Sequence, residues 1–238
     1  MKILKTFLVV FILISASQTF SYDFVKNIKV DLNSDGKIDT VALSISKDGM
    51  KYTLSINDSK TEGKFEDGEC DGFAVFDIDS SDKYKEVAVH TPGPSDDDIY
   101  VFYWYDGKSI LKMGELSRWP DIKGNGIVYV KDWMGFWQKT EKYILDKESR
   151  KLVKVPQEFY YVGIEASVDK TFPIYKTRDL NDVVANLKEK SKILIILCEP
   201  SLQDFQKNRY LIKSETNLLG WCDEKTLLEK VSNLPLAD

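Results

Sequence analysis

The sequence predicts an all-β protein of two domains that follows an N-terminal export signal. Short apolar runs that alternate with polar residues recur along the chain, as at Val41, Leu43 and Ile45. This alternation is the pattern of a strand with one buried face. Asp-Gly pairs at 48–49 and 106–107 separate such runs. Asp-Gly indicates a hairpin because a type I′ turn needs positive φ at both central residues.

The first 21 residues have the three-part pattern of a secretory signal peptide. Lys2 and Lys5 supply positive charge, residues 7–16 form an apolar run, and residues 15–17 offer small side chains for cleavage. The run is shorter than the ~20 apolar residues that span a bilayer. We therefore expect a secreted or cell-wall-associated protein with no transmembrane anchor after cleavage. An uncleaved N-terminal anchor is the alternative.

The first domain, residues 22–158, is expected to consist of short strands joined by turns. The predicted strands are 41–46, 51–56, 73–78, 86–91, 99–105, 108–113, 127–130, 136–139 and 142–145. A helical pattern does not recur in this part of the chain.

Charge distribution narrows the range of partners. The formal net charge is −5, and the segment 66–98 holds eleven carboxylates against Lys83 and Lys85. A basic patch of the kind that binds nucleic acid is missing from the sequence. Such a density of negative charge repels itself unless solvent or a cation relieves it.

The most specific motif is an acidic loop at residues 31–39. Asp31, Asn33 and Asp35 occupy positions 1, 3 and 5, Gly36 occupies position 6, and Asp39 closes the loop. Oxygen ligands at this spacing suit calcium, and the backbone carbonyl of Lys37 would add another. Position 12 is Ala42 rather than glutamate, so the loop is not an EF-hand. The alternative is a turn whose side chains bond their own backbone.

A second acidic loop repeats the arrangement of strand, loop and strand. It runs from 77 to 86 and lacks a glycine. Its candidate calcium ligands are Asp77, Asp79, Ser81, Asp82 and Glu86.

Together the segments 30–45 and 73–110 resemble FG-GAP or VCBS-type repeats, the units of integrin-like β-propellers. The resemblance covers about residues 22–115 and extends to exported bacterial proteins. It implies that Asp31, Asn33, Asp35 and Asp39 bind one calcium ion. It implies a second calcium ion at Asp77, Asp79, Ser81 or Asp82, and Glu86. Two or three units cannot close a propeller of four to eight blades, so we expect a small, open, propeller-like β-sheet domain.

The second domain, residues 160–238, contains one ambiguous segment. Leu180, Val183, Val184 and Leu187 have helical spacing, which predicts a helix over 181–190. Residues 162–228 nevertheless resemble a bacterial SH3-like domain through 166–168, 173–175, 183–187, 192–197, 210–213 and Gly220-Trp221. That resemblance implies an SH3-like barrel with strand, turn and strand at 183–197, which we prefer. Residues 226–231 predict a short helix.

Three further residue types leave alternatives open. Cys198 and Cys222 are expected either to form a disulfide or to be buried thiols, with Cys70 unpaired in a polar loop. The aromatic runs at 102–105 and 119–137 indicate either buried sheet faces or a platform for a sugar or a protein partner. His90 is the only histidine, and strand alternation places it on a solvent-facing side.

These observations favour a calcium-binding, non-catalytic binding or structural protein of the cell envelope or extracellular space. Its expected partner is a cell-wall polymer or an extracellular protein. The alternative is a carbohydrate- or peptidoglycan-active hydrolase that uses the clustered carboxylates.

Overall fold

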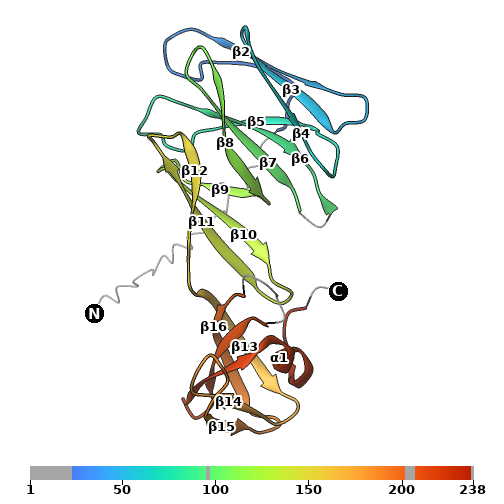
Figure 1. Ribbon diagram of the computed structural model, residues 1–238, viewed down its shortest axis with the longest axis vertical. Helices are drawn as coiled ribbons and strands as arrows, with labels where there is room; N and C mark the ends of the chain where they lie inside the picture. Colours follow the sequence, from blue (N-terminus) through green and yellow to red (C-terminus); the bar gives the residue numbers. More distant parts are fainter. Residues whose placement is uncertain (1–22, 95–96, 202–206, 237–238) are drawn as a thin grey trace, which may run out of the picture.

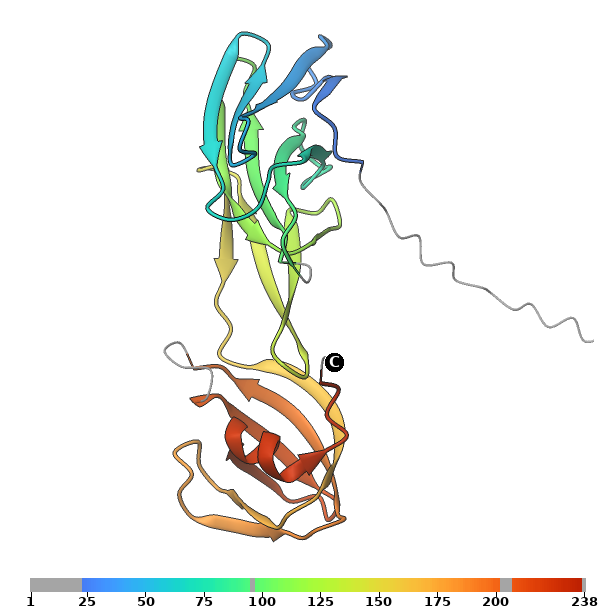
Figure 2. The same ribbon diagram turned by 90° about the vertical axis from the view of Figure 1, so that its right-hand side faces the viewer.

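The computed structural model describes residues 23–94, 97–201 and 207–236. The predicted signal peptide at 1–21 lies outside these residues. The described chain is all-β, with four antiparallel sheets and one α-helix, α1 (Glu224–Lys230). None of its helices is both long and apolar enough to span a bilayer. The sheets follow one another along an elongated molecule, with the C-terminal sheet at one end (Figures 1 and 2).

The first three sheets share one topology. Each is a four-stranded meander in which strands consecutive in the chain are hydrogen-bonded neighbours. Sheet 1 contains β1 (Asn27–Val30), β2 (Asp39–Ile45), β3 (Lys51–Ile56) and β4 (Ser59–Lys64). Sheet 2 contains β5 (Gly72–Phe76), β6 (Glu86–Thr91), β7 (Ile99–Tyr105) and β8 (Ile110–Ser117). Sheet 3 contains β9 (Pro120–Ile122), β10 (Ile127–Trp133), β11 (Gln138–Asp146) and β12 (Lys151–Val155).

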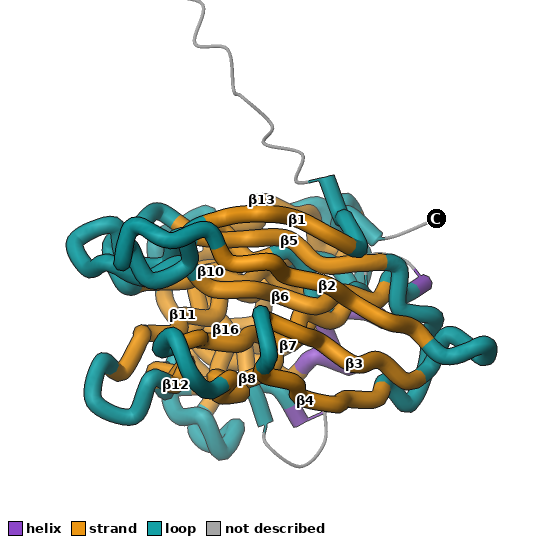
Figure 3. Tube along the Cα trace, turned by 90° about the horizontal axis from the view of Figure 1, so that it is seen from above, coloured by secondary structure: helices purple, strands orange, loops and turns teal. Residues whose placement is uncertain are grey.

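Sheet 2 lies between the other two. One apolar core, which includes Leu54 and Val89, joins sheet 1 to one face of sheet 2. A second core, which includes Phe102 and Val128, joins the opposite face of sheet 2 to sheet 3. Every residue of β6 is consequently buried, which explains why apolar residues do not alternate with polar ones over 87–89. Figure 3, which looks along the long axis, shows the strands stacked in layers.

The C-terminal sheet has seven strands in the order β15-β14-β18-β17-β16-β13-β19. In the described residues it keeps two edges, at β15 and β19, and is not closed into a barrel. Its strands are β13 (Tyr160–Val168), β14 (Phe172–Tyr175), β15 (Val183–Leu187), β16 (Lys192–Glu199), β17 (Arg209–Ser214), β18 (Leu219–Asp223) and β19 (Val231–Ser232). The loop between β10 and β11 adds Phe136 and Trp137 to the core of this sheet.

The structure decides the ambiguous segment in favour of a strand. Residues 183–187 form β15, so the helix that the apolar spacing predicted over 181–190 is wrong. Leu180 and Asp182 both have positive φ, which interrupts a helix. Leu187 is 5% exposed while Val183 is 55% exposed, so the spaced apolar residues do not share one buried face.

Predicted elements elsewhere are present with shifted bounds. The two strands predicted at 136–139 and 142–145 form one strand, β11, which begins only at Gln138, and the strand predicted at 108–113 is β8. The C-terminal helix α1 is confirmed, beginning two residues earlier than predicted. Its N-cap is Asp223, whose carboxylate accepts a hydrogen bond from the Thr226 amide at 2.7 Å. The strands β1, β4, β9 and β12 were not predicted.

The three cysteines are buried free thiols. Cys198 on β16 and Cys222 on β18 each lie opposite Tyr210 in the sheet register, because β17 lies between these two strands. Strands two positions apart in a sheet are ~9.6 Å apart, whereas a disulfide requires Cα atoms within about 7 Å. The disulfide alternative is therefore wrong, and the buried-thiol alternative is confirmed. Cys70 is also buried, at 6% exposure.

Candidate functional site: two acidic loops

The first acidic loop connects β1 to β2, and its side chains bond the loop backbone. Asp39 Oδ2 accepts a hydrogen bond from the Leu32 amide at 3.0 Å, and Asp31 Oδ2 accepts one from the Gly36 amide at 3.0 Å. Gly36 has a φ of +82°, a conformation that glycine adopts without strain. The turn interpretation of the loop thus describes its hydrogen bonds in this structure.

Two shorter turns lie inside this loop. Asn33 Oδ1 accepts from the Asp35 amide at 3.2 Å, and Asp35 Oδ1 accepts from the Lys37 amide at 2.8 Å. Asp39 Oδ1 also accepts from Asn57 Nδ2 at 2.7 Å. One oxygen remains without a partner, since Asp31 Oδ1 is buried and makes no hydrogen bond.

The second acidic loop connects β5 to β6 and repeats this design. Glu86 Oε2 accepts from the Ile78 amide at 3.0 Å, as Asp39 does from Leu32. Asp79 Oδ1 accepts from the Ser81 amide at 3.1 Å, and Asp82 Oδ1 accepts from the Tyr84 amide at 2.8 Å. Here too one buried oxygen, Glu86 Oε1, has no hydrogen-bond partner.

Backbone hydrogen bonds connect these loops from sheet to sheet. The Leu32 carbonyl accepts from the Lys85 amide, and the Ile78 carbonyl accepts from the Gly126 amide, each at 2.8 Å. In both cases the donor is the residue just before the second strand of the next sheet. The corresponding loop of sheet 3, residues 123–126, contains Asn125 and no carboxylate. The repeated unit is therefore structural, while its acidic side chains are confined to sheets 1 and 2.

The two loops differ in their positive partners. Lys147 Nζ lies 2.5 Å from Asp79 Oδ2, and Arg150 Nη1 lies 2.7 Å from Asp82 Oδ2. The Lys147 ammonium and the Ser81 hydroxyl lower the pKa of Asp79 to about 2. In the first loop, by contrast, Asp31, Asp35 and Asp39 form no ion pair with a basic side chain of the described residues.

Glu86 is the most unusual carboxyl group of the two loops. It is fully buried, and burial raises its pKa to about 7, although the Ile78 amide opposes this effect. Asp77, in the same loop, also has its pKa raised by burial. Burial without a compensating cation is unfavourable for a carboxylate.

The side-chain and backbone oxygens of these loops are of the kind that calcium binds. Calcium takes six to eight oxygen ligands at about 2.3–2.6 Å. Over residues 23–94, 97–201 and 207–236, no three or more His, Cys, Asp or Glu side chains are grouped so as to hold a metal ion. A carboxylate oxygen that accepts a backbone amide still has a lone pair for an ion, and Asp31 Oδ1 and Glu86 Oε1 have no donor at all.

The position predicted for His90 is corrected. Only 3% of its surface is exposed, because β6 lies between two sheets and has no solvent-facing side. Its Nδ1 lies 2.8 Å from Asp71 Oδ1, and its ring stacks on Phe24 with centroids 4.0 Å apart. These contacts hold the imidazole in the core.

The aromatic residues of 102–105 and 119–137 were expected either to be buried in sheets or to form an exposed platform, and the structure shows side chains of both kinds. Phe102, Tyr103 and Tyr105 are buried, as are Phe136 and Trp137. In contrast, Trp119 is 41% exposed and Trp133 is 38% exposed. Burial is therefore the right interpretation for most of the aromatic residues, and these two tryptophans remain on the surface.

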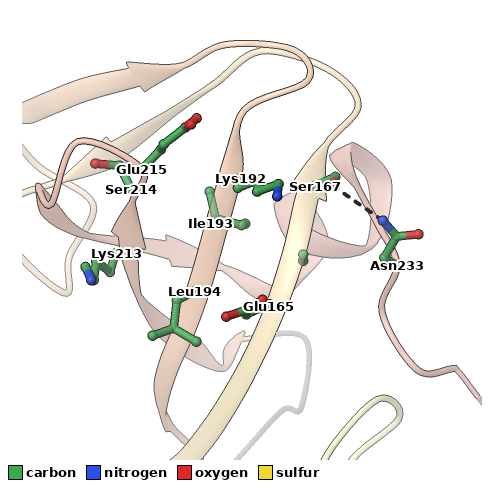
Figure 4. Close-up of a pocket in the computed structure, with 10 residues that line it drawn as sticks. Glu165, Ser167, Lys192, Ile193, Leu194, Lys213, Ser214, Glu215 and Asn233 are labelled. Carbon is green, nitrogen blue, oxygen red and sulfur yellow. Dashed lines mark hydrogen bonds between the residues drawn. The ribbon is translucent and has the colours of Figure 1, made fainter.

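A shallow hollow of about 510 Å³ lies on the C-terminal sheet (Figure 4). Glu165, Lys192 and Glu215 line it with exposed charged side chains of both signs. Asn233 Nδ2 donates a hydrogen bond to Ser167 Oγ at 3.4 Å. Exposed charges of opposite sign interact weakly, and no aromatic residue lines the hollow. We therefore do not assign a ligand to it.

No model of a protein family, no curated protein and no solved structure matches this chain.

Proposed function

We propose that this chain is an exported, non-catalytic binding or structural protein of the cell envelope or extracellular space. In this proposal its acidic loops bind calcium, and the protein holds a wall polymer or an extracellular protein. The observation that carries the calcium part is the shared design of the two loops, each with a buried carboxylate oxygen that lacks a donor. Such an unsatisfied group is unfavourable by ~1–3 kcal/mol, and a bound cation would relieve it.

The proposal includes a finer description of the fold. Three stacked four-stranded meanders with loop-to-loop backbone hydrogen bonds support an open, propeller-like unit over residues 22–158. The strand, turn and strand at 183–199 support an SH3-like domain over 160–238. Fold alone does not establish a ligand, so the function is tested separately.

The first loop is the stronger calcium site of the two. Asp31, Asn33, Asp35 and Asp39 would supply side-chain oxygens, and Lys37 its carbonyl oxygen. In the second loop, calcium would have to compete with Lys147 for Asp79 and with Arg150 for Asp82. We therefore expect weaker binding to Asp77, Asp79, Ser81, Asp82 and Glu86.

Incubation with isolated cell walls tests binding against hydrolysis. We expect the purified protein to sediment with the walls and to release no soluble sugar or peptide. Soluble fragments in the supernatant would instead support the hydrolase that clustered carboxylates permit. A protein that neither sediments nor releases fragments contradicts the assignment to wall polymer.

Calcium is expected to raise the unfolding temperature. Extracellular calcium modules bind at ~10⁻⁴–10⁻³ M, so about 10 mM calcium should stabilise the native state by roughly 1.4–2.7 kcal/mol. Magnesium should act much less, because it dehydrates reluctantly. Asp35→Ala should remove a good part of the calcium effect.

Asp48→Ala is the matched control for this substitution. Asp48 is an aspartate in another turn of sheet 1, where it bonds Ser46 and Met50. It should leave the calcium effect unchanged. Identical melting curves in calcium and in chelator would show that the first loop is only a turn.

A further inference from the structure

The outer face of sheet 3 ends the stack of three sheets and carries an open groove. Val128 and Val130 of β10 are buried against sheet 2. Strand alternation therefore places Tyr129, Lys131 and Trp133 on the opposite face. These three residues line a groove of about 1290 Å³, here called the sheet 3 groove. Sites for small molecules measure about 300–1,000 Å³, so this groove has room for an extended ligand.

Two tryptophans give the sheet 3 groove flat apolar surfaces. Trp119 and Trp133 both line it, and each exposes more than a third of its surface. The ring of Trp119 packs edge-on against buried Tyr100, with centroids 6.0 Å apart and an interplanar angle of 88°. This contact orients a large ring of which 41% of the surface is exposed. The C–H face of a sugar ring is apolar and matches such a surface in size and polarity.

Polar side chains lie beside these rings. Asp121, Gln138 and Thr140 also line the sheet 3 groove. They offer carboxylate, amide and hydroxyl groups, which are the donors and acceptors that sugar hydroxyls require. The groove therefore combines aromatic faces with hydrogen-bonding groups at its sides.

Several charges around the sheet 3 groove form ion pairs with one another. Arg118 Nη2 lies 2.5 Å from Asp97 Oδ1, and its Nε lies 3.0 Å from Asp132 Oδ1. Asp132 also contacts Lys139 at 3.1 Å, and Asp121 contacts Lys123 at 2.6 Å. The groove thus presents no large field of one sign, which favours an uncharged ligand over a polyanion.

The lining also distinguishes a sugar from a protein partner. Among the described residues that line the groove, Leu236 is the one aliphatic side chain. The other lining side chains are aromatic, polar or charged. Aromatic rings combined with amide, hydroxyl and carboxylate groups fit a saccharide better.

We infer that the sheet 3 groove binds a neutral saccharide chain, whose rings stack on Trp119 and Trp133 and whose hydroxyls bond Asp121 and Gln138. This inference rests on the proposed function, because it specifies the class of wall polymer that the protein holds. It adds a site that is separate from the acidic loops.

Titration with defined oligosaccharides tests the inference. The probes are soluble hexamers of β-1,4-linked N-acetylglucosamine and of β-1,4-linked glucose, followed by tryptophan fluorescence and by calorimetry. We expect at least one hexamer to bind the purified protein, and Trp133→Ala to weaken binding by about tenfold or more. Trp221→Ala is the matched control, since this partly exposed tryptophan lies on β18 outside the groove. It should bind as the unmodified protein does.

Each other outcome decides against the inference. If neither hexamer binds, or if Trp133→Ala binds as well as the unmodified protein, the groove is not a saccharide site. Loss of wall retention after protease treatment of the walls would identify a protein partner instead. A dimer in sedimentation that Trp133→Ala dissociates would identify a second copy of the chain as the occupant.

The same experiments separate the inference from the proposed function. Wall retention that persists in Trp133→Ala would leave the proposed function in place and overturn the groove. Hexamer binding that Trp133→Ala abolishes, without retention on walls, would support the groove and remove the wall assignment.

Discussion

Trp137→Ala is expected to lower the free energy of unfolding by about 3–5 kcal/mol, the range for truncating a buried aromatic residue. Trp137 is 3% exposed and belongs to the core of the C-terminal sheet. Its indole Nε1 donates a hydrogen bond to the Tyr210 hydroxyl at 3.2 Å. The substitution removes apolar contacts and this hydrogen bond together. The residue comes from the loop of sheet 3, so the contact between sheet 3 and the C-terminal sheet should weaken as well.

Trp133→Ala provides a matched control because it lies four residues earlier in the same hairpin. Its side chain is 38% exposed and is outside the C-terminal core. It should change the free energy of unfolding by less than about 1 kcal/mol. Urea unfolding of both variants measures the difference. Equal losses would contradict the packing of Trp137 into the C-terminal sheet.

Alkylation of the native thiols is expected to be at least about 100-fold slower than alkylation of the unfolded chain at pH 8. Burial raises the pKa of Cys70 to about 11 and that of Cys198 to about 12, and it also raises the pKa of Cys222. An unperturbed thiol near 8.5 is about one quarter thiolate at pH 8, whereas a thiol near 11 is about one thousandth thiolate. Steric shielding slows the reaction further.

Mass spectrometry after iodoacetamide treatment measures both the rate and the redox state. In urea without reductant, all three cysteines should become alkylated. Two missing modifications would reveal a disulfide between Cys198 and Cys222 and contradict the strand order β16-β17-β18. Rapid labelling of the native protein would show that the thiols are exposed.

The strands predicted from the sequence are those in which the order of apolar and polar residues follows the burial of their side chains. β2 alternates because one face is buried, whereas residues 87–89 of β6 are all apolar because both faces are buried. β4 was missed because its residues, Ser-Lys-Thr-Glu-Gly-Lys, lie at the edge of sheet 1 with little apolar contact. An edge strand is held by backbone hydrogen bonds to one neighbouring strand, and amino-acid composition does not indicate such bonds.

The other differences between the predictions and the structure depend on where a residue lies in the tertiary fold. Alternation within β6 could not reveal that His90 has a sheet on each side. Nor could the aromatic run at 119–137 separate exposed Trp119 and Trp133 from buried Phe136 and Trp137. In β10, the alternation of Val128 and Val130 with Tyr129 and Trp133 indicates two different faces, but only the structure shows which face packs on sheet 2.

For the acidic loops, the sequence identified the residues but not their partners. Asp31, Asn33 and Asp35 lie in the loop between β1 and β2, and Asp39 is the first residue of β2. The pairing of Asp79 with Lys147 and of Asp82 with Arg150 joins positions more than 60 residues apart. Such long-range partners depend on the stacking of sheet 2 on sheet 3, and local spacing does not encode it.

Direct measurement of bound calcium tests the central claim most closely. Equilibrium dialysis of the purified protein against radioactive calcium, over a range from about 10⁻⁵ to 10⁻² M, gives the number of bound ions and their affinity. We predict one saturable site that Asp35→Ala weakens strongly and Asp48→Ala leaves intact, with any second site weaker. No saturable binding over this range, or binding that Asp35→Ala does not alter, would contradict the assignment of the first acidic loop.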